Sequence, residues 1–168
     1  MLRRCLVLSV CLGLAFILPQ CVSREKPSET APGFTLTSLD GEEIRLSDLR
    51  GKTIFLDFWA TWCGPCRESI PHLVSLYKTH RENGFLIIGI SVDKGGADLV
   101  RRFTASMGIP YPVAMATGDL ERQYGVTALP TGFLIDREGK IRDKILGFSP
   151  SIAKQLEAKV AALTSEKP

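Results

Sequence analysis

Two cysteines separated by two residues, Cys63 and Cys66, have the spacing that suits redox chemistry. Residues 53–59, before them, are β-branched and aromatic and predict a buried strand, whereas residues 70–77 carry apolar side chains at helical spacing. Cys63 therefore lies at a strand-to-helix turn, where the positive end of the helix dipole favours a thiolate and lowers the thiol pKa. We expect Cys63 to be the exposed, attacking thiol and Cys66 a shielded thiol, one turn further on, that attacks a mixed disulfide on Cys63. The pair can perform thiol–disulfide exchange.

The same two cysteines have two other readings, half of a zinc site or a structural disulfide. No second cysteine pair follows them, and His72 and His80 are not spaced to complete a metal site. We therefore predict no metal and no cofactor beyond the dithiol itself.

Asp57 lies six residues before Cys63, between Leu56 and Phe58 in the apolar strand. This surrounding predicts a buried carboxylate whose pKa is raised by desolvation. An acid that faces solvent from a half-exposed strand is the alternative. If it is buried near Cys66, Asp57 is a candidate proton acceptor for the second thiol.

Residues 1–20 form a signal peptide or an N-terminal membrane anchor, because two arginines precede an uninterrupted run of apolar and small residues over 5–18. Residues 18–21 are similar to a bacterial lipoprotein cleavage box in which Cys21 would carry the lipid; ordinary cleavage and an uncleaved anchor remain alternatives. We expect residues 21–30 to be a linker and residues 31–165 the folded domain. The protein is then extracytoplasmic and attached to the membrane.

The composition indicates one globular domain, and the charge balance does not suggest a nucleic-acid partner. The chain has 168 residues, 45% of them hydrophobic, and a net charge of only +3. Strand and helix patterns alternate and are followed by a final hairpin around residues 137–139 and a helix that begins after Ser149. Together with a hairpin at Asp40-Gly41, this order predicts a three-layer α/β domain with a mixed central sheet. We expect no nucleic-acid binding and a monomer.

At these residues the chain resembles a known family. Residues 58–66 (FWATWCGPC), Pro71 and residues 129–131 (LPT) are similar to the thioredoxin fold. Within that fold, the chain is most similar to the exported TlpA/ResA-type branch, because of its leader and its segments 31–36 and 46–51. It implies a thioredoxin fold with an N-terminal β-hairpin and an inserted strand–helix element.

The resemblance also implies roles for individual residues. Cys63 is the nucleophile, Cys66 the resolving thiol and Pro130 a cis-proline that faces the pair, although an X-Pro bond at a strand entrance is usually trans. The remaining residues that we assign to substrate docking flank these positions; they are Trp62, Gly64, Pro65, Leu129 and Thr131.

Two positions depart from the TlpA/ResA-type pattern. Asp57 replaces a frequent asparagine and is similar to thioredoxin itself, whereas Ser69 stands where ResA-type proteins carry a functional glutamate. The serine weakens the case for apocytochrome c as the substrate, the ResA-type role. The thioredoxin-like Gly64-Pro65 dipeptide favours a reductant over an oxidase.

The sequence therefore predicts an extracytoplasmic reductant of protein disulfides that a membrane electron donor re-reduces. A thiol peroxidase of the AhpC/TSA type is one alternative, because that family shares the Ala-Pro-x-Phe opening, but Trp59 stands where its proline would precede the cysteine. A non-enzymatic copper-binding assembly module is the other, and it needs a Cys-x-x-x-Cys spacing that this chain lacks.

Overall fold

The computed structural model describes residues 29–165, which form two small sheets and four α-helices. In chain order the elements are β1 (Thr35–Thr37), β2 (Glu43–Arg45), β3 (Thr53–Trp59), α1 (Gly64–His80), β4 (Phe85–Ser91), α2 (Ala97–Met107), β5 (Val113–Met115), α3 (Gly118–Gln123), β6 (Thr131–Ile135), β7 (Ile141–Leu146) and α4 (Pro150–Ser165). Two short 3-10 helices, Leu46–Leu49 and Arg81–Asn83, follow β2 and α1.

The central sheet has the strand order β5-β4-β3-β6-β7. β3, β4 and β5 run parallel, whereas β6 is antiparallel to β3 and β7 is antiparallel to β6. β1 and β2 form a separate antiparallel hairpin. The mixed sheet, the N-terminal hairpin and the inserted pair α2–β5 confirm the predicted thioredoxin fold.

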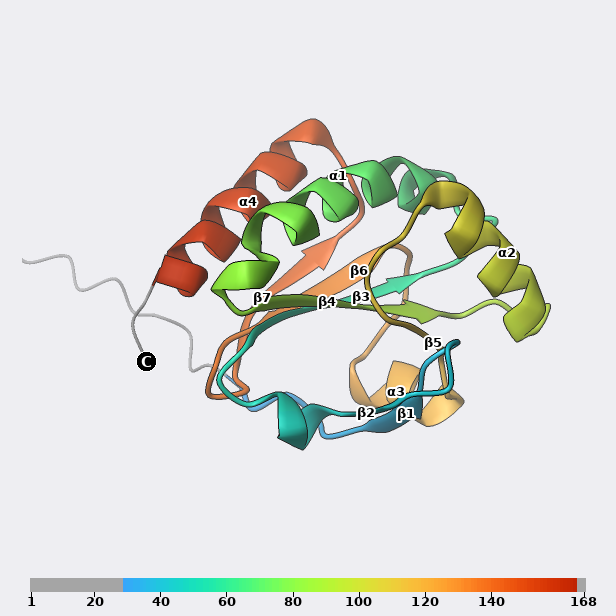
Figure 1. Ribbon diagram of the computed structural model, residues 1–168, viewed down its shortest axis with the longest axis horizontal. Coiled ribbons are helices and arrows are strands. Elements are labelled where there is room, and N and C mark those ends of the chain that lie inside the picture. The colour runs from blue at the N-terminus through green and yellow to red at the C-terminus, as the bar shows by residue number, and fades with distance from the viewer. Residues whose placement is uncertain (1–28, 166–168) are drawn as a thin grey trace, which may run out of the picture.

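The two faces of the sheet are covered by different layers. In Figure 1, α1 and α4 lie above the sheet, and the β1–β2 hairpin and α3 lie below it. Alternation along β3 divides its side chains between the layers: Ile54, Leu56 and Phe58 pack in the lower core, whereas Phe55 and Trp59 pack in the upper core. The same alternation places Asp57 on the upper face, under the helices.

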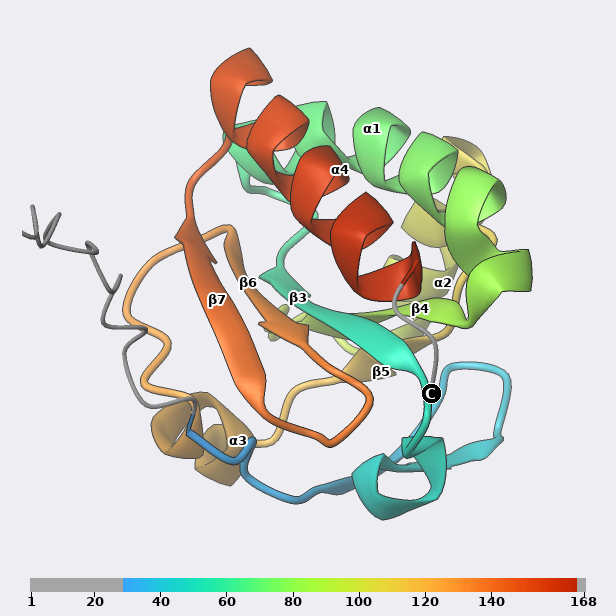
Figure 2. The ribbon, with the colours of Figure 1, turned by 90° about the vertical axis from the view of Figure 1, so that its left-hand side faces the viewer.

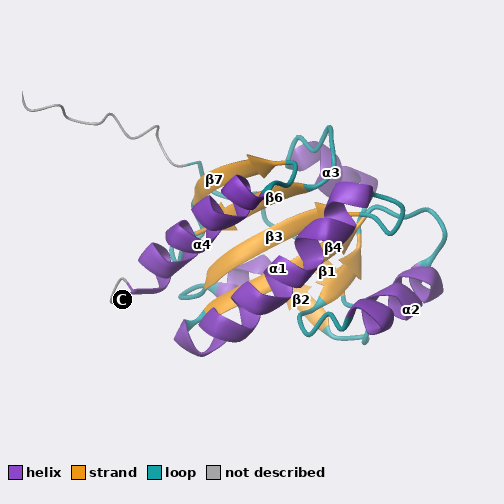
Figure 3. Cartoon of the chain, turned by 90° about the horizontal axis from the view of Figure 1, so that it is seen from above, coloured by secondary structure: helices purple, strands orange, loops and turns teal. Residues whose placement is uncertain are grey.

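The helices on the upper face begin at capped ends and pack side by side. α4 begins at Pro150 after Ser149, whose Oγ accepts a hydrogen bond from the Ile152 N–H at 3.3 Å. Figures 2 and 3 show α4 beside α1 over the sheet. Leucines of both helices share one core cluster, which fixes the height of the α1 N-terminus above β3.

The N-terminal end of the described chain pairs with the sheet edge. Thr30 forms an isolated antiparallel bridge with Lys140, and the Ala31 N–H donates to the Gly139 carbonyl at 3.0 Å. The predicted leader, including Cys21, and most of the predicted linker lie outside the described residues. Within residues 29–165, no helix is long and apolar enough to cross a membrane.

Candidate active site

The turn between β3 and α1 brings the two cysteines together. Cys63 and Cys66 form a disulfide with an S–S distance of 2.05 Å and a Cα–Cα distance of 5.2 Å. Cys63 is also the N-cap of α1, and its sulfur accepts a hydrogen bond from the Cys66 N–H at 3.3 Å. Because a peptide N–H and the helix N-terminus both face this sulfur, they favour its thiolate when the disulfide is reduced.

The two sulfurs differ in their access to solvent. Cys63 is 6% exposed and lines an open groove, whereas Cys66 is 0% exposed and lies in the upper core. The order of exposure agrees with the sequence prediction, but Cys63 is more enclosed than expected because it packs in the same core cluster as Cys66. Of the two sulfurs, only that of Cys63 belongs to a residue that lines the groove.

A buried hydrogen-bond network fixes the residues that precede Cys63. The Asp93 carboxylate accepts hydrogen bonds from the Thr61 N–H at 2.9 Å and from the Thr61 hydroxyl at 2.6 Å. Ser91 Oγ donates to the same carboxylate at 2.8 Å. Sequence reasoning missed Asp93, although an acid directly after a buried parallel strand was a signal that could have found it. Asp93 is a positioning residue, since it holds the turn and does not line the groove.

Asp57 is buried, as the apolar strand predicts, with 2% of its surface exposed. Within residues 29–165, no hydrogen bond or ion pair reaches its carboxylate. Burial alone raises the pKa of Asp57 from 3.8 to about 7. The carboxyl group can therefore take up or release a proton near neutral pH, as a proton acceptor for a thiol must.

Two glycines flank Asp57 across the sheet, Gly89 on β4 and Gly132 on β6. A Cβ atom on Gly132 would come within 2.1 Å of the Phe55 ring, and one on Gly89 would come within 3.0 Å of Trp59 Nε1. The absence of a side chain at Gly132 thus leaves room for the Phe55 ring, and its absence at Gly89 leaves room for the Trp59 ring. One of the two rings, Phe55, lines the same cavity as Asp57.

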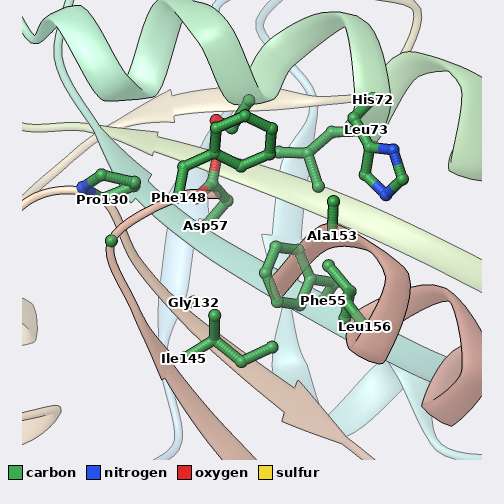
Figure 4. Close-up of a pocket in the computed structure, with 12 residues that line it drawn as sticks. Phe55, Asp57, His72, Leu73, Pro130, Gly132, Ile145, Phe148, Ala153 and Leu156 are labelled. Atoms are coloured by element: carbon green, nitrogen blue, oxygen red, sulfur yellow. The ribbon is translucent and has the colours of Figure 1, made fainter. Parts of the chain in front are cut away.

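Asp57 lines a small cavity of about 30 Å³ (Figure 4). Pro130, Phe148 and Ser69 are among its other lining residues. The Ser69 hydroxyl donates to the Cys66 carbonyl at 2.8 Å, so the cavity wall is joined directly to Cys66. Asp57 is the only acid among the twelve lining residues.

Four of the five predicted docking residues line the groove at Cys63, whereas Pro130 lines the Asp57 cavity. Trp62, Gly64, Pro65 and Leu129 line the groove together with Cys63, and Trp62 is 69% exposed. The Leu129–Pro130 peptide bond is cis, as the family resemblance implied, but Pro130 is buried and lines the Asp57 cavity.

Thr131 differs from the expectation that it contacts substrate. It is fully buried as the first residue of β6, and its hydroxyl donates to the Ala128 carbonyl at 2.7 Å. Its side chain therefore shapes the loop before Pro130. The groove also contains a charged residue that sequence reasoning missed, Glu121 on α3.

Known proteins are similar in sequence to most of this chain. Thiol-disulfide oxidoreductase ResA from Bacillus thuringiensis is 37% identical over 163 residues, which are 95% of this chain and 92% of that protein. The AhpC/TSA family model matches residues 27–144. This chain belongs to the AhpC/TSA family.

Solved structures place this AhpC/TSA-family protein among thioredoxin-fold redox proteins. A thiol:disulfide interchange protein of the thioredoxin family from Chlorobium tepidum is 32% identical, with a TM-score of 0.75, over 83% of this chain and 99% of that one. The pneumococcal exposed lipoprotein thioredoxin Etrx1 is 28% identical, with a TM-score of 0.68, over 79% of this chain and all of that one.

The relatives and the disulfide together define the activity of this AhpC/TSA-family member. It is a thiol-disulfide oxidoreductase, and its predicted resemblance to the ResA-type branch is confirmed. The match to the AhpC/TSA family is also compatible with a thiol peroxidase. The similarity to ResA is therefore what favours a thiol-disulfide oxidoreductase over a thiol peroxidase.

Proposed function

We propose that this thiol-disulfide oxidoreductase reduces disulfides of extracytoplasmic proteins, with Cys63 as the attacking thiol and Cys66 as the resolving thiol. The observation that carries the proposal is the placement of the two sulfurs. One caps a helix and lines an open groove, and the other is enclosed next to the cavity of Asp57.

In the first step the Cys63 thiolate attacks one sulfur of a substrate disulfide. The substrate S–S bond breaks, a bond between Cys63 and that sulfur forms, and the other substrate sulfur leaves as a thiolate that takes a proton from solvent. The Cys66 N–H and the α1 N-terminus stabilise the attacking thiolate before the reaction.

In the second step Cys66 resolves the mixed disulfide. Its thiol proton passes to the Asp57 carboxylate, and the thiolate attacks Cys63 Sγ. The second substrate sulfur leaves as a thiolate, and the enzyme holds the Cys63–Cys66 disulfide seen here. Two electrons have moved from the dithiol to the substrate. Asp57 suits this step because its raised pKa, about 7, lets it accept a proton and release it again.

The direction of electron flow rests on the thioredoxin-like residues Gly64, Pro65 and Asp57. A reductant outside the cytoplasm needs its own electron supply, so we propose a dithiol donor in the membrane and attachment through the leader or a lipid on Cys21. The likeness to an exposed lipoprotein thioredoxin supports this location. The catalytic domain acts as a monomer.

The reduction potential tests the proposal. Equilibration of the purified protein with glutathione buffers should give a value below about −220 mV, towards the potential of thioredoxin. A value above about −180 mV would overturn the assignment as a reductant and indicate an oxidase or isomerase.

A further inference from the structure

The groove beside Cys63 has a volume of about 530 Å³ and is lined by ten residues. Nine of these ten are uncharged, and most present carbon atoms, including the exposed ring of Trp62. The exception is Glu121, which belongs to α3 and lines the groove together with residues of the cysteine turn. A single carboxylate thus adjoins the surface over which a substrate approaches Cys63.

The backbone of Glu121 is fixed at both of its polar groups. Its N–H donates to the Thr117 carbonyl at 3.3 Å, and its carbonyl accepts from the Val126 N–H at 2.9 Å. The second bond ties α3 to residues 126–129, which form one wall of the groove. These bonds fix the backbone of Glu121 relative to that wall of the groove.

The Glu121 carboxylate is half-buried and makes no ion pair or hydrogen bond within residues 29–165. Arg122, the adjacent cation on α3, is already paired with Asp119. An acid in the first turn of a helix gains some stability from the helix dipole, but Asp119 occupies that turn as well. The helix dipole alone does not require an acid that faces an apolar groove.

We propose that Glu121 selects substrates, so that the preferred disulfide-bonded segment is apolar around its cysteine and carries a lysine or arginine beside it. The cation would pair with the Glu121 carboxylate while the apolar residues cover Trp62 and the groove wall. This inference rests on the proposed function, because it assumes that the occupant of the groove is the substrate that Cys63 attacks.

Model peptides test the selection directly. Each peptide contains one cysteine linked to 5-thio-2-nitrobenzoate among apolar residues, with lysine, glutamine or glutamate placed at each position up to three residues from the cysteine. Attack by Cys63 of a Cys66→Ser variant forms the peptide–Cys63 disulfide and releases the coloured thiolate, so absorbance gives the second-order rate. Rates with free glutathione, measured on the same peptides, correct for their intrinsic reactivity.

At the best position, the corrected rate for the lysine peptide should exceed that for the glutamate peptide by about two- to fivefold, the range for a partly exposed ion pair. The ratio should fall in high salt, which screens the pair. It should approach one in Glu121→Gln and invert in Glu121→Lys. Glu138→Gln, the same change in an exposed turn between β6 and β7, should keep the wild-type ratio.

Further outcomes distinguish the selection by Glu121 from the proposed function itself. Trp62→Ala should slow all peptides alike, because it removes apolar contact and no charge. Equal ratios in wild type and Glu121→Gln would overturn the selection and leave the carboxylate only its helix-dipole role. A failure of every peptide to form an adduct on Cys63 would instead overturn the proposed function itself.

Discussion

The groove is lined by Cys63 and the Asp57 cavity is joined to Cys66 through Ser69, but the two spaces differ in size, access and charge. The groove is open, has a volume of about 530 Å³ and includes the exposed Trp62. The cavity is less open than the groove, has a volume of about 30 Å³ and is lined by a carboxylate that has no hydrogen-bond or ion-pair partner within residues 29–165. A substrate segment fits only the groove, whereas the cavity has room for one or two waters at most.

In the proposed mechanism, this difference assigns the two halves of the reaction to two regions. Cys63 exchanges sulfur bonds at the groove, where a protein substrate can dock. In the same mechanism Cys66 passes its proton to Asp57 in the interior, where burial raises the pKa of Asp57 to about 7. The disulfide is the link between them, so substitutions on each side should affect different steps.

The largest expected effect comes from removing one sulfur at a time. Cys66→Ser should accumulate a stoichiometric covalent adduct with a disulfide substrate, because the first attack proceeds and the resolving step cannot. Cys63→Ser should form no adduct, since the remaining sulfur is fully enclosed. Both variants should lose all turnover. Mass spectrometry with peptide mapping locates the adduct; an adduct on Cys66 in the Cys63→Ser protein would contradict the division.

Asp57→Asn should slow the resolving step by about 100-fold near pH 6–7, the usual contribution of a positioned proton acceptor. The defect should shrink towards pH 9, where solvent hydroxide can deprotonate Cys66 unaided. The rate of the first attack should not change. Stopped-flow release of the second thiol from a mixed disulfide on Cys63 measures the step.

Glu68→Gln provides the control for this prediction, because Glu68 is an exposed acid on α1 beside the same cysteine. It should leave both steps unchanged. Identical resolving rates for wild type and Asp57→Asn across pH 6–9 would remove Asp57 from the mechanism.

The same carboxylate should make stability depend on pH. The pKa of Asp57 is raised by folding, so its favourable contribution is complete below about pH 4 and is lost as pH rises through about 7. Relative to Asp57→Asn, the oxidised wild-type protein should therefore lose about 3 kcal/mol of unfolding free energy between pH 5 and pH 8. Urea unfolding at both pH values measures this. A constant difference between the two proteins would show that Asp57 does not titrate in the fold.

Much of the fold could be predicted because its signals are local. The apolar run of β3, the Asp40-Gly41 turn and the Ser149 cap each depend on neighbouring residues, and each lies where the sequence indicates. The burial of Asp57 followed from the same apolar run. The cis peptide before Pro130 came only from the family resemblance, because an X-Pro bond by itself favours trans.

The parts of the site that could not be predicted depend on distant segments. Glu121 meets Cys63 in one groove although 58 positions separate their numbers, and Phe148 reaches the Asp57 cavity from the loop before α4. The burial of Thr131 also depends on distant residues, because it results from the pairing of β6 with its neighbouring strands. These contacts cannot be predicted from the spacing of residues along the chain.

Alkylation of the reduced protein tests the central claim, the difference between the two thiols, most directly. Iodoacetamide is added at a series of pH values from 5 to 9, and mass spectrometry follows each cysteine separately. The account predicts that Cys63 reacts with a midpoint well below the ordinary thiol pKa of about 8.5, while Cys66 remains nearly unlabelled at neutral pH. A Cys63 that reacts no faster than Cys66 at neutral pH would contradict it.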